Sequence, residues 1–436
     1  MISGEQGFAR ERRALSGDSA GSERLARVLF LHPSNELYGS DTSLLYLLRG
    51  LDRSRFYPSV ILANDLPYEG LLGRELEASG IECRSLPIAV ARRKYLSPTG
   101  LAGFLQRVRQ SSRMVAEIIE REQFDIVHTN TLAVWTGARA ARRTRRLHNW
   151  HIREQLEHPQ MLVQVMQRFV PSHSTHVIGV SQAVLENILV TPEARAKGRV
   201  IYNGADPTVW LNAPGRERIR AELGCGSDEV IIGIVARISR MKATDLCVEA
   251  VARLMAYNSH VHCLIAGAPV LGQTEMMDQV RAVIAASPAP ERFHLLGERR
   301  DAPDLMAGLD ILAAPSRTGE GASLSIIQGM FSGRPVVATD VGGNKELVAH
   351  GETGFIIPRE DVTALTQALG ALVADEGLRA RMGAAGRARA IERFSLTRVH
   401  REFNDFLWGA YQESLVVNGA PTVNRAPAGQ HATVRV

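Results

Sequence analysis

Apolar positions along the chain form short continuous runs that alternate with longer segments in which they recur every three or four residues. The short runs, closed by turn residues, are typical of parallel strands buried on both faces, and the longer spacing is typical of helices that cover such a sheet. Strands are predicted at residues 27–33, 60–63, 82–86, 125–129, 147–152 and 175–181, and again at 230–237, 261–267, 293–297, 309–315, 333–339 and 354–358. The chain therefore contains two successive α/β series.

The same pattern divides the chain into five parts. The first series occupies residues 25–205, the second occupies residues 206–394, and a turn rich in Asn, Gly and Asp separates them. Helices are predicted at residues 44–51, 70–79 and 101–122, then from about residue 244 and at 324–331, 362–374 and 376–391. A last helix at 395–416 is long enough to cross back to the first domain. The leader, residues 1–24, and the tail, residues 417–436, lack apolar periodicity and are expected to be disordered.

Length and charge set limits on this picture. The chain has 436 residues, 45% of them hydrophobic, and a net charge of +5. A single core rarely extends over so many residues, so two domains are expected. Basic residues gather in two spans without acids, between Glu82 and Glu117 and between Asp125 and Glu154. Each span is either a solvated helix face or a surface for anionic lipid or a phosphate-bearing acceptor. Nucleic acid is not an expected partner, because no binding motif and no interleaved aromatic residues accompany these spans.

The cysteines and the hydropathy of the sequence indicate the cellular compartment of the protein. The four cysteines, Cys83, Cys225, Cys247 and Cys263, have neither metal-ligand nor disulfide spacing, so they are interpreted as reduced packing residues. The first thirteen residues contain acids and no apolar segment, which excludes a secretory signal there. No apolar run reaches membrane-spanning length. A cytoplasmic location is expected, with peripheral contact at the cytosolic membrane face as an extension of it.

One strand-to-helix junction carries candidate chemistry. The apolar run 309–315 ends at a proline, and helical spacing begins at Leu324. The amides between them, from Gly321 to Ser323, lack intrahelical partners and lie at the positive end of the helix dipole, which is a favourable seat for an anion. Glu320, just before these amides, is either a helix cap or a functional carboxylate. The next strand also ends in a glycine turn, Gly342-Gly343, and both turns are expected at the same carboxyl edge of the sheet.

Two cations follow another strand of the second series. Arg237 ends the strand at 230–237, and Lys242 precedes the helix expected from Thr244. An arginine fork and a lysine ammonium beside a helix start are suited to a diphosphate. The alternative is a pair of exposed loop cations, which the predicted proximity to Glu320 disfavours.

Several motifs together resemble those of the family 4 glycosyltransferases, which have the GT-B fold. The likeness extends from about residue 28 to residue 403 and is strongest in the second half. There the motifs are Arg237-x4-Lys242, Ser316-x-x-x-Glu320-Gly321, Gly333-x-Pro335-Val336-Val337-Ala338, Val341-Gly342-Gly343-x-x-Glu346 and Gly351-Glu352-Thr353-Gly354. In the first half they are Gly39-Ser40-Asp41, Asp125-Ile126-Val127-His128 and Tyr202-Asn203-Gly204-Ala205-Asp206.

The resemblance implies two Rossmann-like domains that face each other across a cleft. It also implies transfer of a sugar, with retention of configuration, from a nucleotide diphosphate sugar to a saccharide or lipid-linked acceptor, as in polysaccharide or glycolipid synthesis. No obligatory metal or cofactor is implied. Arg237 and Lys242 would bind the diphosphate, and Glu320 would bind hydroxyl groups of the sugar. The remaining donor contacts implied are Gly39, Ser40, Ala322, Ser323 and Leu324.

Two histidines at strand ends are further candidates. The resemblance places His151 in the active site, where a neutral imidazole would bond to the donor sugar. The alternative is a strand-end histidine that bonds to the backbone. His128 is a candidate on the acceptor side.

The sequence departs from the family pattern at two places. Gln328 stands where the family has a second glutamate that binds both ribose hydroxyls, and Gly321-Ala322-Ser323 replaces the usual Gly-Phe-Gly. A catalytically weak relative that binds nucleotide sugar as a regulatory or scaffold subunit is therefore the alternative hypothesis. A sugar-nucleotide epimerase is disfavoured, because the pair Arg237 and Lys242 together with Glu320 matches a transferase.

Overall fold

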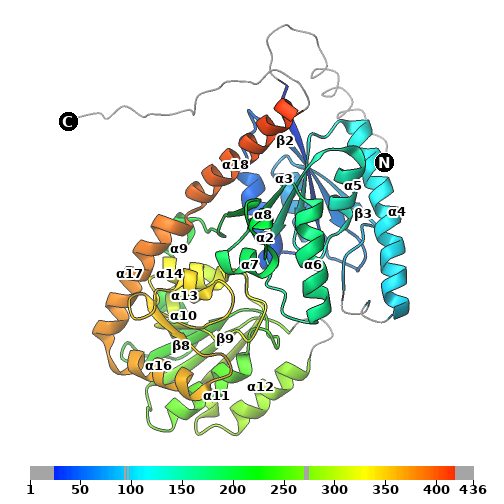
Figure 1. Ribbon diagram of the computed structural model, residues 1–436. Helices are drawn as coiled ribbons and strands as arrows, with labels where there is room; N and C mark the ends of the chain where they lie inside the picture. Colours follow the sequence, from blue (N-terminus) through cyan, green and yellow to red (C-terminus); the bar gives the residue numbers. More distant parts are fainter. Residues whose placement is uncertain (1–23, 93–94, 96–97, 270–273, 418–436) are drawn as a thin grey trace, which may run out of the picture.

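The computed structural model describes residues 24–92, 95, 98–269 and 274–417, and within these ranges the chain forms two α/β domains, one above the other in Figure 1. Each domain is built on one fully parallel sheet with helices on both faces, as the apolar pattern predicts. The predictions of disorder for residues 1–23 and 418–436 lie outside the described residues. Residue 24, which the prediction places in the leader, belongs to the fold, because Arg24 donates a hydrogen bond to the Gln123 carbonyl at 2.9 Å. Val417, which the prediction places in the disordered tail, is instead the last residue of the final helix.

The first domain contains a seven-stranded sheet of order β3-β2-β1-β4-β5-β6-β7. Its strands are β1 (Ala26–His32), β2 (Phe56–Ala63), β3 (Glu82–Leu86), β4 (Ile126–Asn130), β5 (Leu147–Ile152), β6 (His176–Gly179) and β7 (Gly198–Val200). Its helices are α2 (Gly39–Arg49), α3 (Leu71–Ala78), α4 (Pro98–Glu122), α5 (Thr136–Thr144), α6 (Gln160–His173), α7 (Gln182–Ile188) and α8 (Pro192–Arg195).

The second domain contains a six-stranded sheet of order β10-β9-β8-β11-β12-β13. Its strands are β8 (Val230–Val235), β9 (Val261–Ala266), β10 (Phe293–Gly297), β11 (Ile311–Ala314), β12 (Val336–Thr339) and β13 (Gly354–Ile357). The helices that follow β7 are α9 (Pro207–Trp210), α10 (Arg216–Glu222), α11 (Thr244–Met255), α12 (Glu275–Ala285), the 3-10 helix η2 (Pro290–Arg292), α13 (Ala302–Gly308), α14 (Leu324–Phe331), α15 (Asn344–Leu347), α16 (Val362–Ala374), α17 (Glu376–Phe394) and α18 (Leu396–Val417).

The central strands are apolar because both faces of each sheet are covered. Every residue of β4, β5, β9, β11 and β12 is buried. Burying one valine, leucine or isoleucine side chain contributes about 1.5–3 kcal/mol, so these strands dominate the stability of both domains. The prediction of two parallel α/β units is confirmed.

One helix begins earlier than the apolar spacing suggests. The prediction started it at Leu44, whereas α2 begins at Gly39. The carboxylate of Asp41 accepts a hydrogen bond from the Tyr38 amide at 2.9 Å, and this local bond closes the first turn before the apolar face begins. The glycine turn of the first domain is therefore the start of a helix, aimed at the second domain.

The last helix crosses back to the first domain. Figure 1 shows α18 running from the lower domain up along the side of the upper one. Its Phe403 and Leu407 are fully buried in a core shared with β1 and α2. The amide of Asn404 donates to the Gly50 carbonyl at 2.8 Å, and its side-chain oxygen accepts from the Asp52 amide at 2.8 Å. The helix therefore clamps the two domains together.

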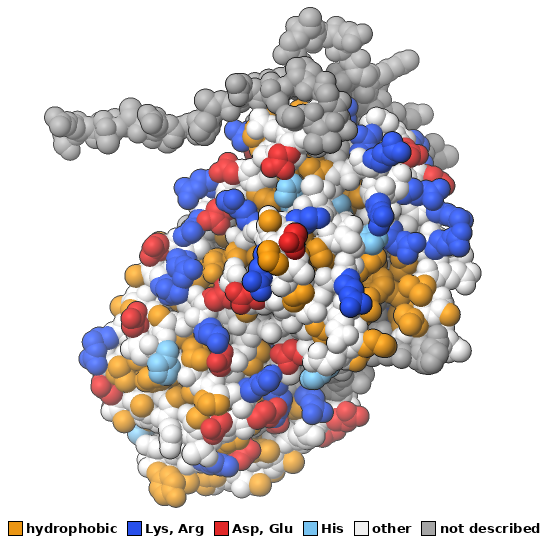
Figure 2. Space-filling view, viewed as in Figure 1, with side chains coloured by type: hydrophobic (Ala, Val, Ile, Leu, Met, Phe, Trp, Pro, Cys, Tyr) orange, Lys and Arg blue, Asp and Glu red, His pale blue; other side chains and the backbone are white. Residues whose placement is uncertain are grey.

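The first of the two basic spans, between Glu82 and Glu117, is partly neutralised. Arg84 forms ion pairs with Glu122 and Glu82, and Arg92 pairs with Asp65. Arg107, Arg109 and Arg113 on α4 remain exposed, as do Arg139, Arg142 and Arg143 on α5. In Figure 2 acidic and basic side chains are interspersed over most of the visible face. The predicted basic surface is thus smaller than the sequence suggests. None of the described helices is long and apolar enough to cross a membrane.

Candidate functional site

A cavity of about 590 Å³ lies between the two domains, where the carboxyl ends of the strands from both sheets meet. Most of the sequence-predicted site residues come from different elements of both domains and share this cavity. They are Gly39, Ser40, Arg237, Lys242, Glu320, Ala322, Ser323, Leu324 and Gln328. The structure thus brings together residues that are up to 289 positions apart in sequence (328 − 39).

Glu320 and Lys242 form the central contact of this cavity. The lysine ammonium donates to both carboxylate oxygens, at 2.8 and 2.7 Å, and the Ser316 hydroxyl donates to one of them at 3.0 Å. The Glu320 side chain is 8% exposed and that of Lys242 is 17% exposed. Glu320 does not cap α14, because the residue before that helix is Ser323. The helix-cap interpretation of Glu320 is therefore wrong, and the carboxylate is directed to the cavity instead.

Arg237 lies over an aromatic ring of the other domain. Its guanidinium carbon is 4.6 Å from the centroid of the Tyr38 ring. Burial raises the pKa of the Tyr38 phenol more than the nearby Arg237 lowers it, so the ring is uncharged at neutral pH. The contact holds the guanidinium at the mouth of the cavity by a cation–π interaction while its N–H groups stay available to an anion.

Two helix starts face each other across the cavity. The first amides of α14 have no intrahelical partners, and the Ser323 hydroxyl does not cap them. A Cβ atom added to Gly39, the first residue of α2, would lie 4.0 Å from the Leu324 side chain. The positive ends of two helix dipoles therefore converge with Arg237 and Lys242, a set suited to a diphosphate.

The turn that carries Glu320 is packed against the first domain, and its glycines are required there. Glu320 forms an isolated antiparallel bridge with Glu154, directly after β5. A Cβ on Gly321 would lie 2.1 Å from the Arg153 carbonyl, and one on Gly342, at φ +53°, would lie 1.5 Å from the Glu320 carbonyl. Side chains at either position would separate these backbones.

Arg153 is a cavity residue that the sequence analysis missed. Its guanidinium donates to Asn203 at 2.8 Å and to Asn130 at 2.6 Å. The Asn130 amide in turn contacts His32 Nδ1 at 2.7 Å, and His32 Nε2 bonds to Asp41 at the start of α2. This buried chain connects the cavity wall to the glycine turn. The available signal was position, since Arg153 follows the end of β5.

The charged groups in this chain of hydrogen bonds, Arg153 and Asp41, are largely buried. Burial lowers the pKa of the Arg153 guanidinium to about 9, against the opposing effect of Glu154 and Asp41, so it stays protonated at neutral pH. Burial also raises the pKa of Asp41, but hydrogen bonds from His32 and Ser34 and from the backbone outweigh that effect and lower it below the usual value. Asp41 is therefore ionised and balances part of the positive charge beneath the cavity.

His151 and His128 are not brought to the cavity. Both side chains are buried, with ring centroids 5.5 Å apart, and the His128 ring lies 5.4 Å from that of Phe403 on α18. Among the described residues, no ring nitrogen of either histidine has a hydrogen-bond partner. Burial, followed by the positive charge of Arg153, lowers the pKa of both far below the usual value, so both are neutral. Direct contact of either imidazole with a sugar in the 590 Å³ cavity is not supported.

A second cavity of about 430 Å³ continues from the first and has a largely apolar wall. Glu154, Met241 and Gly319 line both cavities. The apolar part of its wall consists of Ala91, Leu132, Ala133, Trp135, Leu156, Pro159, Leu162 and Met166. We call this cavity the apolar groove. It is a candidate site for part of an acceptor.

Glu346 joins the two domains beside the cavity. Its carboxylate accepts hydrogen bonds from the Gln182 and Ala183 amides at 2.8 and 2.9 Å, at the start of α7, and from the Tyr202 hydroxyl at 2.9 Å. Asn203 adds a bond to the Ala322 carbonyl at 2.8 Å. These contacts join the two domains in the arrangement that forms the cavity.

Two family models match the chain. The model described as Glycosyltransferase Family 4 matches residues 38–209, and the model described as Glycosyl transferases group 1 matches residues 215–389. Each model matches most of one domain.

Curated relatives match mainly over parts of their length. The lipopolysaccharide core biosynthesis mannosyltransferase LpsB of Rhizobium meliloti is 30% identical over 199 residues, which are 45% of this chain and 56% of the relative. The alpha-maltose-1-phosphate synthase of Mycolicibacterium smegmatis is 33% identical over 234 residues, 50% of this chain and 59% of the relative. The chain thus spans little more than half the length of these relatives.

Solved structures match over nearly the whole fold. Anabaena HepE in complex with UDP and glucose superposes with a TM-score of 0.73 at 25% identity, covering 87% of this chain and 98% of that chain. The same protein in complex with UDP-glucose gives a TM-score of 0.74 at 24% identity, covering 88% and 99% of the two chains. The two-domain architecture is therefore one already known from experiment.

Proposed function

The chain belongs to the family 4 glycosyltransferases and has the GT-B fold, and we propose that it transfers a sugar from a nucleotide diphosphate sugar to an acceptor with retention of anomeric configuration. One observation carries the proposal: the guanidinium of Arg237 and the ammonium of Lys242, from the loop after β8, line one cavity between the domains with the carboxylate of Glu320, from the loop after β11. The cavity volume of about 590 Å³ lies within the usual range for small-ligand sites. Named relatives that transfer sugars support the same activity, so a purely regulatory role is not favoured.

In the proposed reaction the bond between the anomeric carbon and the diphosphate breaks. The acceptor hydroxyl oxygen bonds to that carbon on the same face, and its proton passes to the departing diphosphate. Arg237 and Lys242 bind its oxygens and stabilise the charge that grows on them as the bond to the sugar breaks, together with the amides at the start of α14. On donor binding, the Lys242 ammonium exchanges part of its contact with Glu320 for a phosphate oxygen. Glu320 then accepts hydrogen bonds from sugar hydroxyls and fixes the orientation of the ring. No metal is required in this scheme, since the cations and amides supply the positive potential.

The nucleotide base and the sugar of the donor are proposed from similarity to a protein of known structure. HepE, which shares the fold, has structures with UDP, with UDP and glucose, and with UDP-glucose. UDP-glucose is therefore the first donor to test. Gln328 lines the cavity in the place of the family's second glutamate, so we propose that its amide binds the ribose hydroxyls, accepting one hydrogen bond and donating another.

The apolar groove supports an acceptor with a lipid or other apolar portion. Figure 2 shows apolar side chains gathered near the right edge of the visible face. The first turns of α4 and α6 carry exposed apolar side chains. They are Leu101, Leu105, Met161 and Val165, with Met161 74% exposed. Exposed arginines of α4 flank this area. We propose peripheral binding there to the cytosolic face of an anionic membrane, which presents a lipid-linked acceptor to the groove.

The function is tested by turnover. The purified protein is incubated with a panel of nucleotide sugars and a total lipid extract as acceptor, and products are followed by mass spectrometry and by the anomeric coupling of the new linkage. Release of nucleoside diphosphate coupled to a glycosylated product with retained configuration is expected. Absence of hydrolysis and transfer with every donor, with identical behaviour of Glu320→Ala, would reject the proposal. Donor binding without turnover in the presence of an authentic acceptor would instead support the regulatory alternative.

A further inference from the structure

A cluster of nitrogen and sulfur donors lies in the second domain, away from the cavity. Cys225, His262 and His294 each offer one ligand atom, and these atoms all lie within 4.8 Å of one another. Cys225 belongs to the loop between α10 and β8, whereas His262 and His294 lie near the amino ends of β9 and β10. The donor cavity lies at the opposite, carboxyl edge of the same sheet, so the cluster is separate from the proposed active site.

The register of the strands brings the two imidazoles together. His294 pairs with Leu264, two residues beyond His262, so both histidines project from the same face of the sheet. Their rings are stacked, with centroids 5.3 Å apart and an interplanar angle of 14°. His262 Nδ1 lies 3.1 Å from His294 Nε2. Two nitrogens bound to one tetrahedral Zn²⁺ at about 2.0–2.1 Å lie about 3.3 Å apart, so this separation already suits a shared metal.

A carboxylate fixes the orientation of the inner histidine. Glu229 Oε1 lies 3.0 Å from His262 Nε2, and Glu229 Oε2 accepts from the Gly226 amide at 2.6 Å. Since a carboxylate accepts, His262 Nε2 carries the proton and Nδ1 keeps its lone pair for His294 or a metal. A carboxylate behind a histidine is the usual arrangement that orients a metal-binding imidazole.

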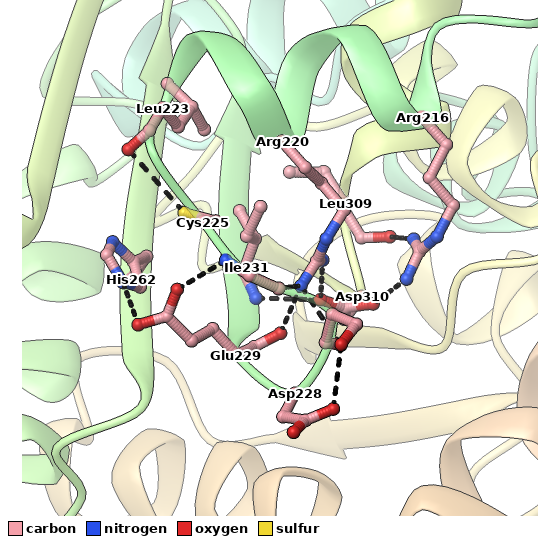
Figure 3. A network of polar contacts seen from close by, with 12 residues as sticks. Arg216, Arg220, Leu223, Cys225, Asp228, Glu229, Ile231, His262, Leu309 and Asp310 are labelled. Atoms are coloured by element: carbon pink, nitrogen blue, oxygen red, sulfur yellow. Dashed lines mark hydrogen bonds and ion pairs between the residues drawn. The ribbon is translucent and has the colours of Figure 1, made fainter.

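The loop that carries the cysteine is held by several polar contacts, as Figure 3 shows. Arg220, which is 7% exposed, donates to the carbonyls of Gly226, Ser227 and Glu229, and its other nitrogen pairs with Asp310 at 2.9 Å. The contact of the Cys225 thiol is a weak one, 3.8 Å to the Leu223 carbonyl. The sulfur is thus positioned beside the imidazoles without a strong bond that a metal would have to displace.

We propose that Cys225, His262 and His294 bind Zn²⁺ and thereby tie the loop before β8 to the edge of the second sheet. One thiolate and two imidazoles are a donor set typical of zinc, whereas Mg²⁺ and Ca²⁺ prefer oxygen. β10 is an edge strand of this sheet, so a metal bridge from the loop through β9 to β10 stabilises the edge. Water fills the fourth position, next to the partly exposed His294. Binding requires the sulfur to come within about 3.5 Å of the ligating nitrogens, and the thiol to lose its proton.

The alternative is a metal-free hydrogen-bond chain in which His294 donates to His262 and His262 donates to Glu229. Metal titration separates the two. The untagged full-length protein, treated with chelator, is titrated with ZnCl₂ against a chromophoric competitor, and with CoCl₂ to record the thiolate-to-cobalt charge-transfer band. We expect one Zn²⁺ per chain with a dissociation constant in the micromolar range or tighter. At a hundredfold excess over that constant, the melting temperature of the second domain should rise by roughly 5–10 °C.

Matched variants assign the ligands. Cys225→Ser should abolish the charge-transfer band, whereas Cys83→Ser, at a half-buried thiol of the other domain, should leave it unchanged. Glu229→Gln should weaken Zn²⁺ binding by about 10–100-fold, because the carboxylate only orients His262. His294→Gln, at the most exposed member, serves if the buried variants fail to fold, as judged by circular dichroism. Stoichiometric binding that is lost in Cys225→Ser supports the site. Zn²⁺ binding that is absent, or equal in Cys225→Ser and the parent protein, overturns it and leaves the glycosyltransferase proposal untouched.

Discussion

Replacing Lys242 by alanine separates catalysis from stability. The ammonium makes two hydrogen bonds of 2.7–2.8 Å to Glu320 and, in the proposed reaction, faces the charge that develops on the leaving diphosphate. Removing one preplaced charge donor of this kind typically costs about 2.7–4 kcal/mol of transition-state stabilisation, which is a loss of about 10²–10³ in kcat. The variant also leaves the buried Glu320 carboxylate with only Ser316 as side-chain donor among the described residues, a destabilisation of about 1–3 kcal/mol.

The two effects can be measured independently. Donor turnover is followed by release of nucleoside diphosphate at a temperature where circular dichroism shows the variant to be folded, and stability is followed by thermal unfolding. The double variant Lys242→Ala with Glu320→Gln should recover most of the lost stability, because no charge remains unpaired, while its turnover stays low. Arg143→Ala, at an exposed arginine of α5, is the matched control and should keep turnover within about twofold. Equal losses of turnover in Lys242→Ala and Arg143→Ala would refute the assignment of the diphosphate to the second domain.

Three further substitutions test other parts of the site. Gln328→Glu should lower KM for the donor by about tenfold, since a carboxylate accepts hydrogen bonds from both ribose hydroxyls. An unchanged or higher KM would count against binding of the ribose at this position. Glu346→Ala removes the acceptor of two amide hydrogen bonds at the start of α7. Small-angle scattering should then show a larger radius of gyration, and kcat/KM should fall about tenfold. Unchanged scattering would contradict the role of Glu346 in holding the two domains together. Gly321→Ala should abolish turnover, because its Cβ would lie 2.1 Å from the Arg153 carbonyl. The control Gly409→Ala, whose Cβ would have no atom within 4 Å, should leave turnover unchanged. An active Gly321→Ala protein would mean that the backbones at Gly321 and Arg153 need not be in contact.

The sequence predicts the sheets well because each buried strand carries its own apolar pattern. β3, β5 and β10 match the predicted residues at both ends, and the turns proposed to bind the donor follow from where strands stop. Position relative to a strand end could not resolve the direction of a side chain. β5 ends at Ile152 as predicted, but the His151 ring is covered by Phe403 of α18, at a centroid distance of 6.3 Å. Phe403 lies far from His151 in the sequence, so the local sequence pattern around His151 does not indicate this contact.

The prediction from sequence was also limited by contacts between segments that are distant in the chain. Arg153 gains its place from Asn130 and Asn203, and neither has a spacing from it that would have suggested a chain of hydrogen bonds. The cysteines showed no metal spacing along the sequence, yet Cys225 meets two histidines once the loop before β8 folds against the sheet. The first basic span likewise loses part of its charge to acids of other elements, as Arg84 does to Glu122. Tertiary neighbours, rather than local propensity, decide each of these cases.

The central claim is that the cavity between the domains holds the diphosphate of the donor. A crystal structure of the protein soaked with UDP tests it most directly. The account predicts both phosphates within hydrogen-bonding distance of Arg237 and Lys242, with the amides at the start of α14 on their other side. Phosphates bound elsewhere on the protein, with this cavity filled only by water, would contradict it.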